Sequence, residues 1–260
     1  MPNITLTTDF GTRDWFVGTM KGVILGINPR AAVVDISHEI AAGDIRAGAF
    51  VLKACCRFFP KGTIHVAVVD PRVGSARRAI AVQTADYLFV GPDNGILSWA
   101  LAAEEIKAIA ALENGNYFLP NISATFHGRD IFAPAAAHLS RALPILKLGP
   151  RLNDFVRLRW PEVLLKPGRL VGEVVFIDRF GNAITNIPSE AFRDLRIVNA
   201  AVFRERKRVC GLGEFYQSVP PGKPVALVGS SGFLEVAIYG GNATRSLDLL
   251  VGTKLSVRFH

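Results

Sequence analysis

The chain is poor in cysteine: it has three among 260 residues, and two of them, Cys55 and Cys56, are adjacent. Three thiols with this spacing form neither a disulfide framework nor a zinc ligand set, which excludes disulfide-rich and structural-zinc modules. No apolar run approaches the roughly 20 residues that a membrane span requires. The first residues, MPNITLTTDFG, lack the basic and apolar segments of a signal peptide. We therefore expect a cytoplasmic protein with no membrane partner.

Acidic residues are fewer than basic ones. Lys and Arg number 30 against 22 Asp and Glu, which gives a formal net charge of +8, and most of the excess follows residue 150. This balance is compatible with a nucleic-acid partner, whose binding would depend strongly on salt. The densest basic run, RERKRV from residue 204, is typical of a solvated strand and turn. Because arginine and aromatic residues are not interleaved, we expect no nucleic-acid partner.

Half of the residues are apolar, which is enough for a sizeable core. In the first 150 residues, strand-like apolar segments alternate with segments of helical spacing. Strands are predicted at 3–8, 32–36, 63–69, 79–84 and 87–91, and helices at 15–27, 44–58 and 129–142. This alternation predicts an α/β domain with a mostly parallel central sheet covered on both faces. Ligands bind such sheets at the carboxyl ends of the strands, where Asp9 and Asp70 lie.

The pattern changes after Pro150. Short strands are predicted at 170–177, 196–203, 225–228 and 233–239, with Gly, Pro and Asn between them and no long amphipathic helix. This pattern favours a smaller, all-β, barrel-like domain. The boundary is expected in the stretch 158–168, so the predicted domains are 1–160 and 161–260.

Several common enzyme motifs are missing. No G-x-G-x-x-G follows the first strand, and there is no Walker A loop, no G-x-S-x-G elbow and no H-E-x-x-H. The five histidines are scattered along the chain. These absences argue against a dinucleotide-binding Rossmann domain, a P-loop enzyme, a serine hydrolase with a nucleophile elbow and a metal hydrolase.

Polar residues gather instead in loops that follow apolar strands. Five segments have this character: TTDFGTRDWF, VVDPRVGSARR, TFHGRDIF, IDRFGNAITNI and GSSGFLEVAIYGGNA. Each also has an ordinary structural interpretation. Asp9 could cap a helix, Asp70 could form a surface ion pair with an arginine, and His127 could be a structural histidine. The Asn and Gly residues around Asn182 are common in turns.

In this order and spacing, however, the segments resemble one family. The motifs are TTDFG, HEI at 38–40, VVDP with an Arg seven residues after the Asp, GPDNG at 91–95, TFHGRD, FGNAITNI and SSGFLE. Together they span the chain, and they are similar to the SAM hydroxide adenosyltransferases, the adenosine-forming S-adenosylmethionine hydrolases related to fluorinase and chlorinase. The resemblance implies an N-terminal α/β domain and a C-terminal β-barrel domain. It also implies a homotrimer with active sites at the subunit interfaces.

The resemblance further implies that water or hydroxide displaces methionine from the 5′ carbon of the SAM ribose, with no cofactor and no metal. The implied catalytic residues are Asp70, Arg77 and His127. The implied substrate contacts are Asp9 with the ribose hydroxyls, Asp14 near the methionine end, Asp178 with the methionine amino group, Asn182 with adenine, Ser230 with the methionine carboxylate, and the backbone of Gly240 with the adenine edge. Which of Asp70 and His127 takes the proton from water stays open.

Two residues depart from the family pattern. Arg72 stands where relatives usually have Gly, and Tyr239 where they often have Asn. Two alternative functions also stay open. One is a SAM- or adenosine-binding module without turnover. The other is a halide-dependent SAM halogenase, which Asp70 disfavours because a carboxylate repels a halide.

Overall fold

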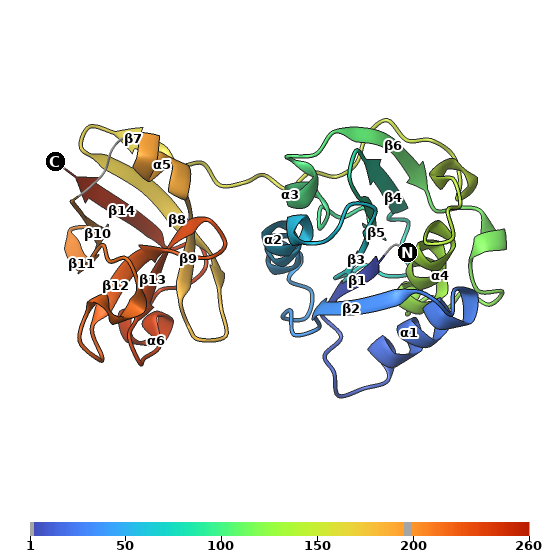
Figure 1. The fold of residues 1–260 in the computed structure, drawn as a ribbon, viewed down its shortest axis with the longest axis horizontal. Coiled ribbons are helices and arrows are strands. Elements are labelled where there is room, and N and C mark those ends of the chain that lie inside the picture. Colours follow the sequence, from blue (N-terminus) through green and yellow to red (C-terminus); the bar gives the residue numbers. More distant parts are fainter. Residues whose placement is uncertain (1–2, 195–198, 260) are drawn as a thin grey trace. The chain divides into compact units, whose positions relative to one another are not determined.

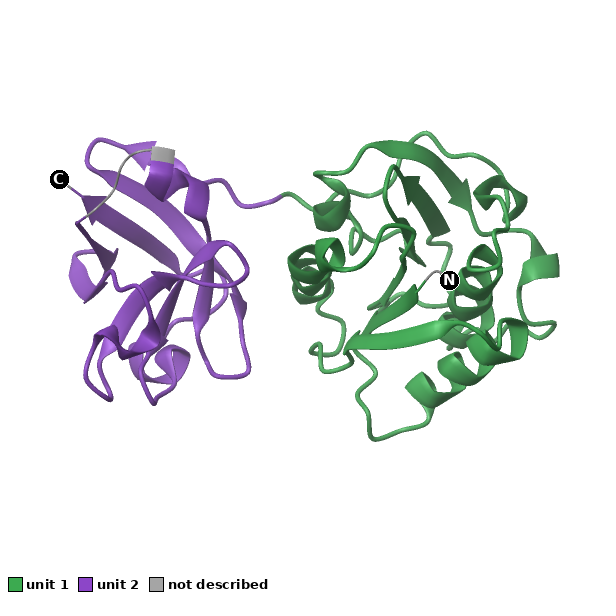
Figure 2. Cartoon of the chain, viewed as in Figure 1, with its two compact units in different colours: residues 1–159 green, residues 160–260 purple. Residues whose placement is uncertain are grey.

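Two compact units make up the chain, residues 1–159 and 160–260 (Figures 1 and 2). The structure is a computed structural model that describes residues 3–194 and 199–259. Across these described ranges, no helix is both long and apolar enough to cross a membrane.

A six-stranded sheet forms the centre of the first unit, in the order β2-β1-β3-β5-β4-β6. Its strands are β1 (Asn3–Thr8), β2 (Ala32–Ser37), β3 (Ile64–Val68), β4 (Ala79–Thr84), β5 (Leu88–Pro92) and β6 (Ile106–Ala111). β1, β2, β3 and β5 run parallel, whereas β4 is antiparallel to both of its neighbours. The sheet is therefore mixed, and the prediction of a mostly parallel sheet is wrong on this point. The link between β4 and β5 is too short for a crossover, so the two strands form a hairpin.

Helices cover both faces of this sheet. They are α1 (Phe16–Ile27), α2 (Ile45–Cys55), α3 (Ser98–Leu101) and α4 (Ala133–Leu139), with shorter turns η1 (Cys56–Phe58), η2 (Gly115–Tyr117), η3 (Gly128–Phe132) and η4 (Ile145–Lys147). Figure 1 shows α1 beside α4, and α2 beside α3. Because side chains alternate along a strand, Val66 and Val68 lie in the core with α1 and α4, whereas Ala67 and Val69 lie in the core with α2 and α3. The three predicted helices are present, although the predicted helix 129–142 begins as the π-helical turn η3 and continues as α4 only to Leu139.

The second unit is a mostly antiparallel, nearly barrel-shaped sheet in the order β11-β10-β14-β8-β9-β13-β12, with β7 paired to β8. Its strands are β7 (Leu164–Lys166), β8 (Arg169–Ile177), β9 (Ala183–Pro188), β10 (Ala200–Arg204), β11 (Lys207–Gly211), β12 (Pro224–Val228), β13 (Phe233–Ile238) and β14 (Lys254–Phe259). A single bridge between Leu212 and Ala226 joins the two ends of this order. Its short helical turns are α5 (Ser189–Asp194), α6 (Ala243–Leu247) and η5 (Tyr216–Ser218). The smaller barrel-like domain was thus correctly expected.

Two predictions need comment in this unit. Residues 196–198 of the predicted strand 196–203 lie outside the described residues, and β10 begins at Ala200. The basic run at 204 forms the exposed hairpin between β10 and β11, with Glu205 in the left-handed conformation at φ 54°. The interpretation of this run as a solvated strand and turn is confirmed.

Candidate functional site

Asp9 and Asp70 follow the carboxyl ends of the neighbouring strands β1 and β3, as the strand pattern predicts. Asp9 does not cap a helix, because α1 begins at Phe16 with Trp15 in the cap position. Its carboxylate instead accepts a hydrogen bond of 2.8 Å from the backbone N–H of Gly43, in the turn before α2. The helix-cap interpretation of Asp9 is therefore wrong.

Asp70, Arg77 and His127 form a continuous hydrogen-bonded cluster. Arg77 Nε and Nη2 donate to Asp70 Oδ2 at 2.9 and 2.5 Å, and Nη2 also lies 2.7 Å from His127 Nδ1. The Arg77 and Asp70 side chains are 6% and 4% exposed. The pair is therefore buried, unlike the surface ion pair that a turn of this sequence could have formed. Arg77 also lies over the ring of Phe132, 5.4 Å from its centroid.

The protonation of His127 follows from its partner. A guanidinium has only N–H donors, so His127 Nδ1 must accept from Arg77, and the ring proton is then on Nε2. Burial and the positive charge of Arg77 both lower the pKa of His127 below its usual value. His127 is therefore neutral near pH 7 and offers an N–H donor, whereas Asp70 offers a carboxylate acceptor.

Close packing of two loops brings the cluster together. Gly74, in the loop between Asp70 and Arg77, has φ +77°, and a Cβ there would lie 2.2 Å from the carbonyl oxygen of Ala124. The loop of Ala124 leads to His127, which precedes the π-helical turn η3. Within η3, the fully buried Asp130 accepts hydrogen bonds from the Ser123 backbone N–H and the Arg129 side chain. Such turns are frequent at functional sites.

A hollow of about 550 Å³ lies beside this cluster. Its lining includes Asp9, Asp70 and His127, so the three sequence segments contribute to one cavity. Phe10, Phe16 and Phe126 also line it, and their rings pack against one another with centroids 5.0 to 5.9 Å apart. The cavity therefore joins charged groups to an aromatic wall. The sequence motifs pointed to the charged residues but not to this wall.

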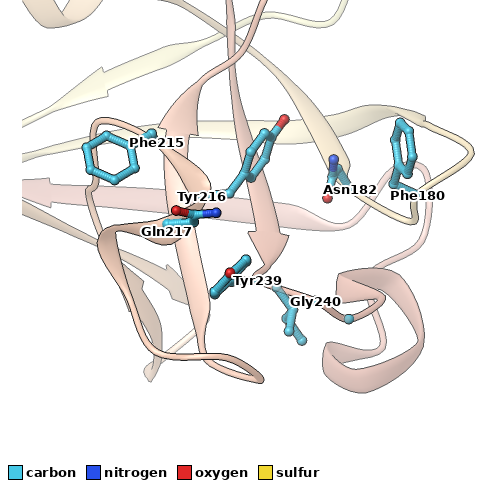
Figure 3. Close-up of a pocket in the computed structure, with 9 residues that line it drawn as sticks. Phe180, Asn182, Phe215, Tyr216, Gln217, Tyr239 and Gly240 are labelled. Atoms are coloured by element: carbon cyan, nitrogen blue, oxygen red, sulfur yellow. The ribbon is translucent and has the colours of Figure 1, made fainter.

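A second hollow, of about 600 Å³, lies in the C-terminal unit (Figure 3). It is lined by Phe180, Asn182, Phe215, Tyr216, Gln217, Ile238, Tyr239, Gly240 and Gly241. In Figure 3, Phe215 and Phe180 lie at its two ends, with Tyr216 and Asn182 between them. Phe180 and Phe215 are 75% and 57% exposed, so two aromatic rings of this hollow are accessible to a ligand.

Asp178 holds Asn182 in this hollow. One carboxylate oxygen of Asp178 accepts from the Asn182 backbone N–H at 2.8 Å, and the other accepts from Asn182 Nδ2 at 2.9 Å. The side-chain oxygen of Asn182 has no hydrogen-bond partner in the described parts of the chain. It is therefore the group that can accept a hydrogen bond from a ligand amino group.

Tyr216 is a site residue to which the sequence motifs did not point, whereas its partner Glu235 is the last residue of the SSGFLE motif. Tyr216 donates a hydrogen bond of 2.5 Å to Glu235 Oε1. Burial raises the pKa of Glu235, even though the Tyr216 hydrogen bond acts in the opposite direction. The pair fixes one aromatic wall of the hollow. Gly43, which binds Asp9 through its backbone, was missed because a backbone N–H has no sequence signature.

Other predicted positions lie apart from these contacts. Asp14 is exposed in the turn before α1, and Ser230 is exposed in the turn between β12 and β13. Arg72 is also exposed and does not adopt a positive φ, so the loop does not require glycine there. Tyr239 lines the second hollow, next to Gly240.

No group of three His, Cys, Asp or Glu side chains arranged for a metal ion occurs within 3–194 and 199–259.

Both units match known families of sequences. Residues 4–149 match the SAM hydroxide adenosyltransferase N-terminal domain, and residues 172–256 match the C-terminal domain of the same family. The chain is 38% identical to an (R)-S-adenosyl-L-methionine hydrolase of Salinispora tropica, over 98% of this chain and 97% of that protein. It is also 38% identical to the hydrolase of that name from Thermus thermophilus, over 97% of this chain and 98% of that one.

More distant sequences and solved structures agree with this placement. A fluorinase of Actinopolyspora mzabensis is 26% identical over 98% of this chain and 97% of its own length. The crystal structure of an uncharacterized conserved protein from Thermotoga maritima superposes with a TM-score of 0.93 at 36% identity, covering 98% of this chain and 99% of that one. With both units matched and the hydrolases similar over nearly their whole length, the chain belongs to the SAM hydroxide adenosyltransferase family.

Proposed function

We propose that the protein hydrolyses S-adenosyl-L-methionine to adenosine and L-methionine, and that its substrate is the (R) sulfonium epimer. The names of relatives at 38% identity support the reaction and the epimer. The observation that carries the proposal is the buried cluster of Asp70, Arg77 and His127 beside a hollow that Asp9 also lines. The cluster combines a proton acceptor, a fixed cation and a neutral N–H donor at one cavity.

The reaction needs little from the protein at the leaving group. When water attacks the 5′ carbon, a C–O bond forms and the C–S bond breaks, and its electron pair stays on the sulfur of methionine. A neutral thioether departs without a proton, so no general acid is required. The attacking water, in contrast, must be oriented in line with the C–S bond and must lose one proton. Orientation can supply several kcal/mol of the barrier, and a proton acceptor typically adds about 10²–10⁴-fold.

We assign the proton to Asp70. Neutral His127 has its proton on Nε2 and its Nδ1 occupied by Arg77, so it donates to the water oxygen and cannot accept from it. The charge of Arg77 stabilises the hydroxide that develops. The attacking water becomes much more acidic as the C–O bond forms, so a carboxylate within reach can accept its proton. Asp70 and His127 thereby take complementary roles.

The remaining predicted residues bind the substrate in this proposal. Asp9 accepts from the ribose hydroxyls, Asn182 accepts from the adenine amino group through its side-chain oxygen, and the Gly240 backbone faces the adenine edge. Asp178, Asp14 and Ser230 contact the methionine portion. The exposed rings of Phe180 and Phe215 provide an apolar surface for a base. The domains 1–160 and 161–260 act within a homotrimer that has its active sites at the subunit interfaces and needs no cofactor.

Halide transfer and binding without turnover fit less well. A halide would meet the Asp70 carboxylate in the cavity, which repels it. A protein that only binds SAM has no need of a buried charged cluster, because desolvating the ion pair is costly.

The test is incubation of the purified protein with (R)- and (S)-SAM separately in water enriched in oxygen-18. We expect adenosine and methionine in equal amounts from the (R) epimer, with the heavy oxygen in the 5′ hydroxyl of adenosine. Label in any other product, or a halogenated nucleoside when chloride is added, would contradict the mechanism. Intact SAM with adenosine bound to the protein would support a binding module instead.

A further inference from the structure

His38 connects the strand that precedes Asp9 to the loop that contains it. It follows β2 directly and is 4% exposed. Its Nδ1 lies 2.8 Å from the hydroxyl of Thr8, the last residue of β1. Its backbone carbonyl accepts a hydrogen bond of 2.7 Å from the N–H of Gly11. Asp9 thus lies between Thr8 and Gly11, which both contact His38. The Asp9 carboxylate itself accepts a hydrogen bond from Gly43.

The ring of His38 is itself oriented by charge. Its Nε2 lies 3.0 Å from Asp35 Oδ1, and Lys21 donates to the other oxygen of Asp35 at 2.6 Å. The Thr8 hydroxyl oxygen also accepts from the Phe10 N–H at 3.3 Å. Because a carboxylate only accepts, the Nε2 beside Asp35 carries a proton. The chain of contacts runs from Lys21 through Asp35 and His38 to Thr8.

The order Asp, His and hydroxyl is that of a nucleophilic triad, but Thr8 cannot serve as a nucleophile. Its side chain is fully buried, and it is not among the residues that line the hollow beside Asp9. A group with no access to a substrate can act only through its neighbours. The adjacent residue in the chain is Asp9, which does line the hollow.

We propose that His38 is a positioning residue, which holds the Asp9 loop through Thr8 and Gly11 so that the Asp9 carboxylate is preorganised for the vicinal hydroxyls of a ribose. The proposal rests on the ribose role of Asp9 in the proposed function. Preorganisation matters here because a carboxylate on a mobile loop must lose conformational entropy when it binds a ligand. His38 therefore contributes to nucleoside affinity and leaves the attack on the 5′ carbon unaffected.

The same sheet contains a matched control. Thr5, three residues earlier on β1, lies 2.8 Å from Nδ1 of His65 on β3, and both side chains are fully buried. This second Thr–His pair has the same chemistry but packs against Phe59, Tyr87 and Phe89, away from the hollow. Loss of the Thr5 hydroxyl should affect stability as loss of the Thr8 hydroxyl does, without affecting Asp9.

The experiment compares Thr8→Val with Thr5→Val, and His38→Ala with His38→Asn. Calorimetry measures the affinity of each variant for adenosine and for 2′,3′-dideoxyadenosine, which lacks the vicinal hydroxyls. We expect Thr8→Val and His38→Ala to bind adenosine about tenfold more weakly, with nearly unchanged dideoxyadenosine affinity. KM for SAM should rise with kcat within about threefold of wild type. Thr5→Val should keep the wild-type ratio of the two affinities.

His38→Asn places an amide oxygen near the Nδ1 position and should recover part of the adenosine affinity. If His38→Ala does not fold, the near-isosteric Thr8→Val decides the question. The proposal would be overturned if folded Thr8→Val kept the wild-type ratio of adenosine to dideoxyadenosine affinity. It would also be overturned if Thr5→Val lost as much adenosine affinity as Thr8→Val. Binding of adenosine does not require turnover, so hydrolysis of SAM by the wild type tests the proposed function separately.

Discussion

Arg77 Nη2 lies 2.7 Å from His127 Nδ1 and 2.5 Å from Asp70 Oδ2, so one guanidinium nitrogen joins residues 50 and seven positions away in the sequence. This geometry sets the tautomer of His127 and compensates the buried charge of Asp70. The first two predictions follow from this contact.

The first prediction concerns pH. The folded pKa of His127 lies below its usual value of about 6.5, because burial and Arg77 disfavour the imidazolium. The unfolded chain therefore binds this proton more readily. The stabilising contribution of neutral His127 is complete above about pH 6.5 and is lost as the pH falls toward the folded pKa. We expect kcat/KM and the urea midpoint to fall together on the acid side of pH 6.5.

The control is His127→Asn, which cannot titrate, so stability should fall less steeply on the acid side of pH 6.5 than in the wild type. The fall that remains is expected from His65, whose pKa burial lowers to about 4 and which therefore also loses stability between about pH 6.5 and 4. An acid limb of stability that is the same in His127→Asn and wild type would show that another group is responsible.

The second prediction concerns the buried ion pair. Arg77→Met leaves the Asp70 carboxylate without a partner, and breaking such a pair costs about 3–5 kcal/mol of unfolding free energy. We expect this loss in urea unfolding, with kcat reduced by at least about 10²-fold. Arg77→Lys should retain more stability than activity, because an ammonium lacks the planar fork that reaches both partners.

An exposed ion pair provides the comparison for Arg77. Lys61 pairs with Asp86 at 2.8 Å, with its side chain 78% exposed. Lys61→Met should change neither unfolding nor turnover measurably, since exposed pairs contribute little. If Arg77→Met were as stable as Lys61→Met, the pair would not be buried as described.

The third prediction concerns the packing of the two catalytic loops. Gly74→Ala would place a methyl group 2.2 Å from the Ala124 carbonyl oxygen, so the loops must separate. We expect a loss of stability and a reduction of kcat, measured by urea unfolding and by adenosine formation. Gly62 also has a positive φ, +85°, but a Cβ there meets no atom within 4 Å. Gly62→Ala should therefore lose only about 1–2 kcal/mol from backbone strain and keep its kcat.

The fourth prediction concerns base recognition. If the Asn182 side-chain oxygen accepts from the adenine amino group, the wild type should prefer adenosine over purine riboside, which lacks that group. Asn182→Ala should bind adenosine about tenfold more weakly and should lose this preference. Asp178→Asn should behave similarly, because Asp178 holds the Asn182 amide.

Asn114→Ala serves as the control for this loss of an amide. Asn114 and Lys147 both lie in the N-terminal unit, where the Asn114 side chain donates to the Lys147 carbonyl. The Asn114→Ala variant should be less stable but should keep the wild-type nucleoside preference in calorimetric titrations. A wild-type protein that binds adenosine and purine riboside equally would refute the role of Asn182.

Much of the secondary structure follows from the sequence alone. The apolar runs of β1 and β3 and the helical spacing of α1 and α2 reflect local sterics and burial, which act over a few residues. The placement of Asp9 and Asp70 at one sheet edge follows from two neighbouring parallel strands, and the structure confirms it. The link between β4 and β5 is too short for a parallel crossover and permits only a hairpin. The antiparallel β4, which makes the sheet mixed, was therefore also predictable from the sequence.

Tertiary structure decided the contacts between distant residues. The Arg77–His127 contact depends on Gly74 packing against Ala124, and the Asp9–Gly43 and Thr8–His38 contacts depend on how the loops close. No periodicity encodes such pairs, since each requires two backbones to meet at a distance of a few ångströms. The sequence by itself therefore determined the strands, the main helices and the residue types at the site. Only the folded chain determined which atoms donate, which accept and which charges are buried, because these depend on the exact approach of segments remote in sequence.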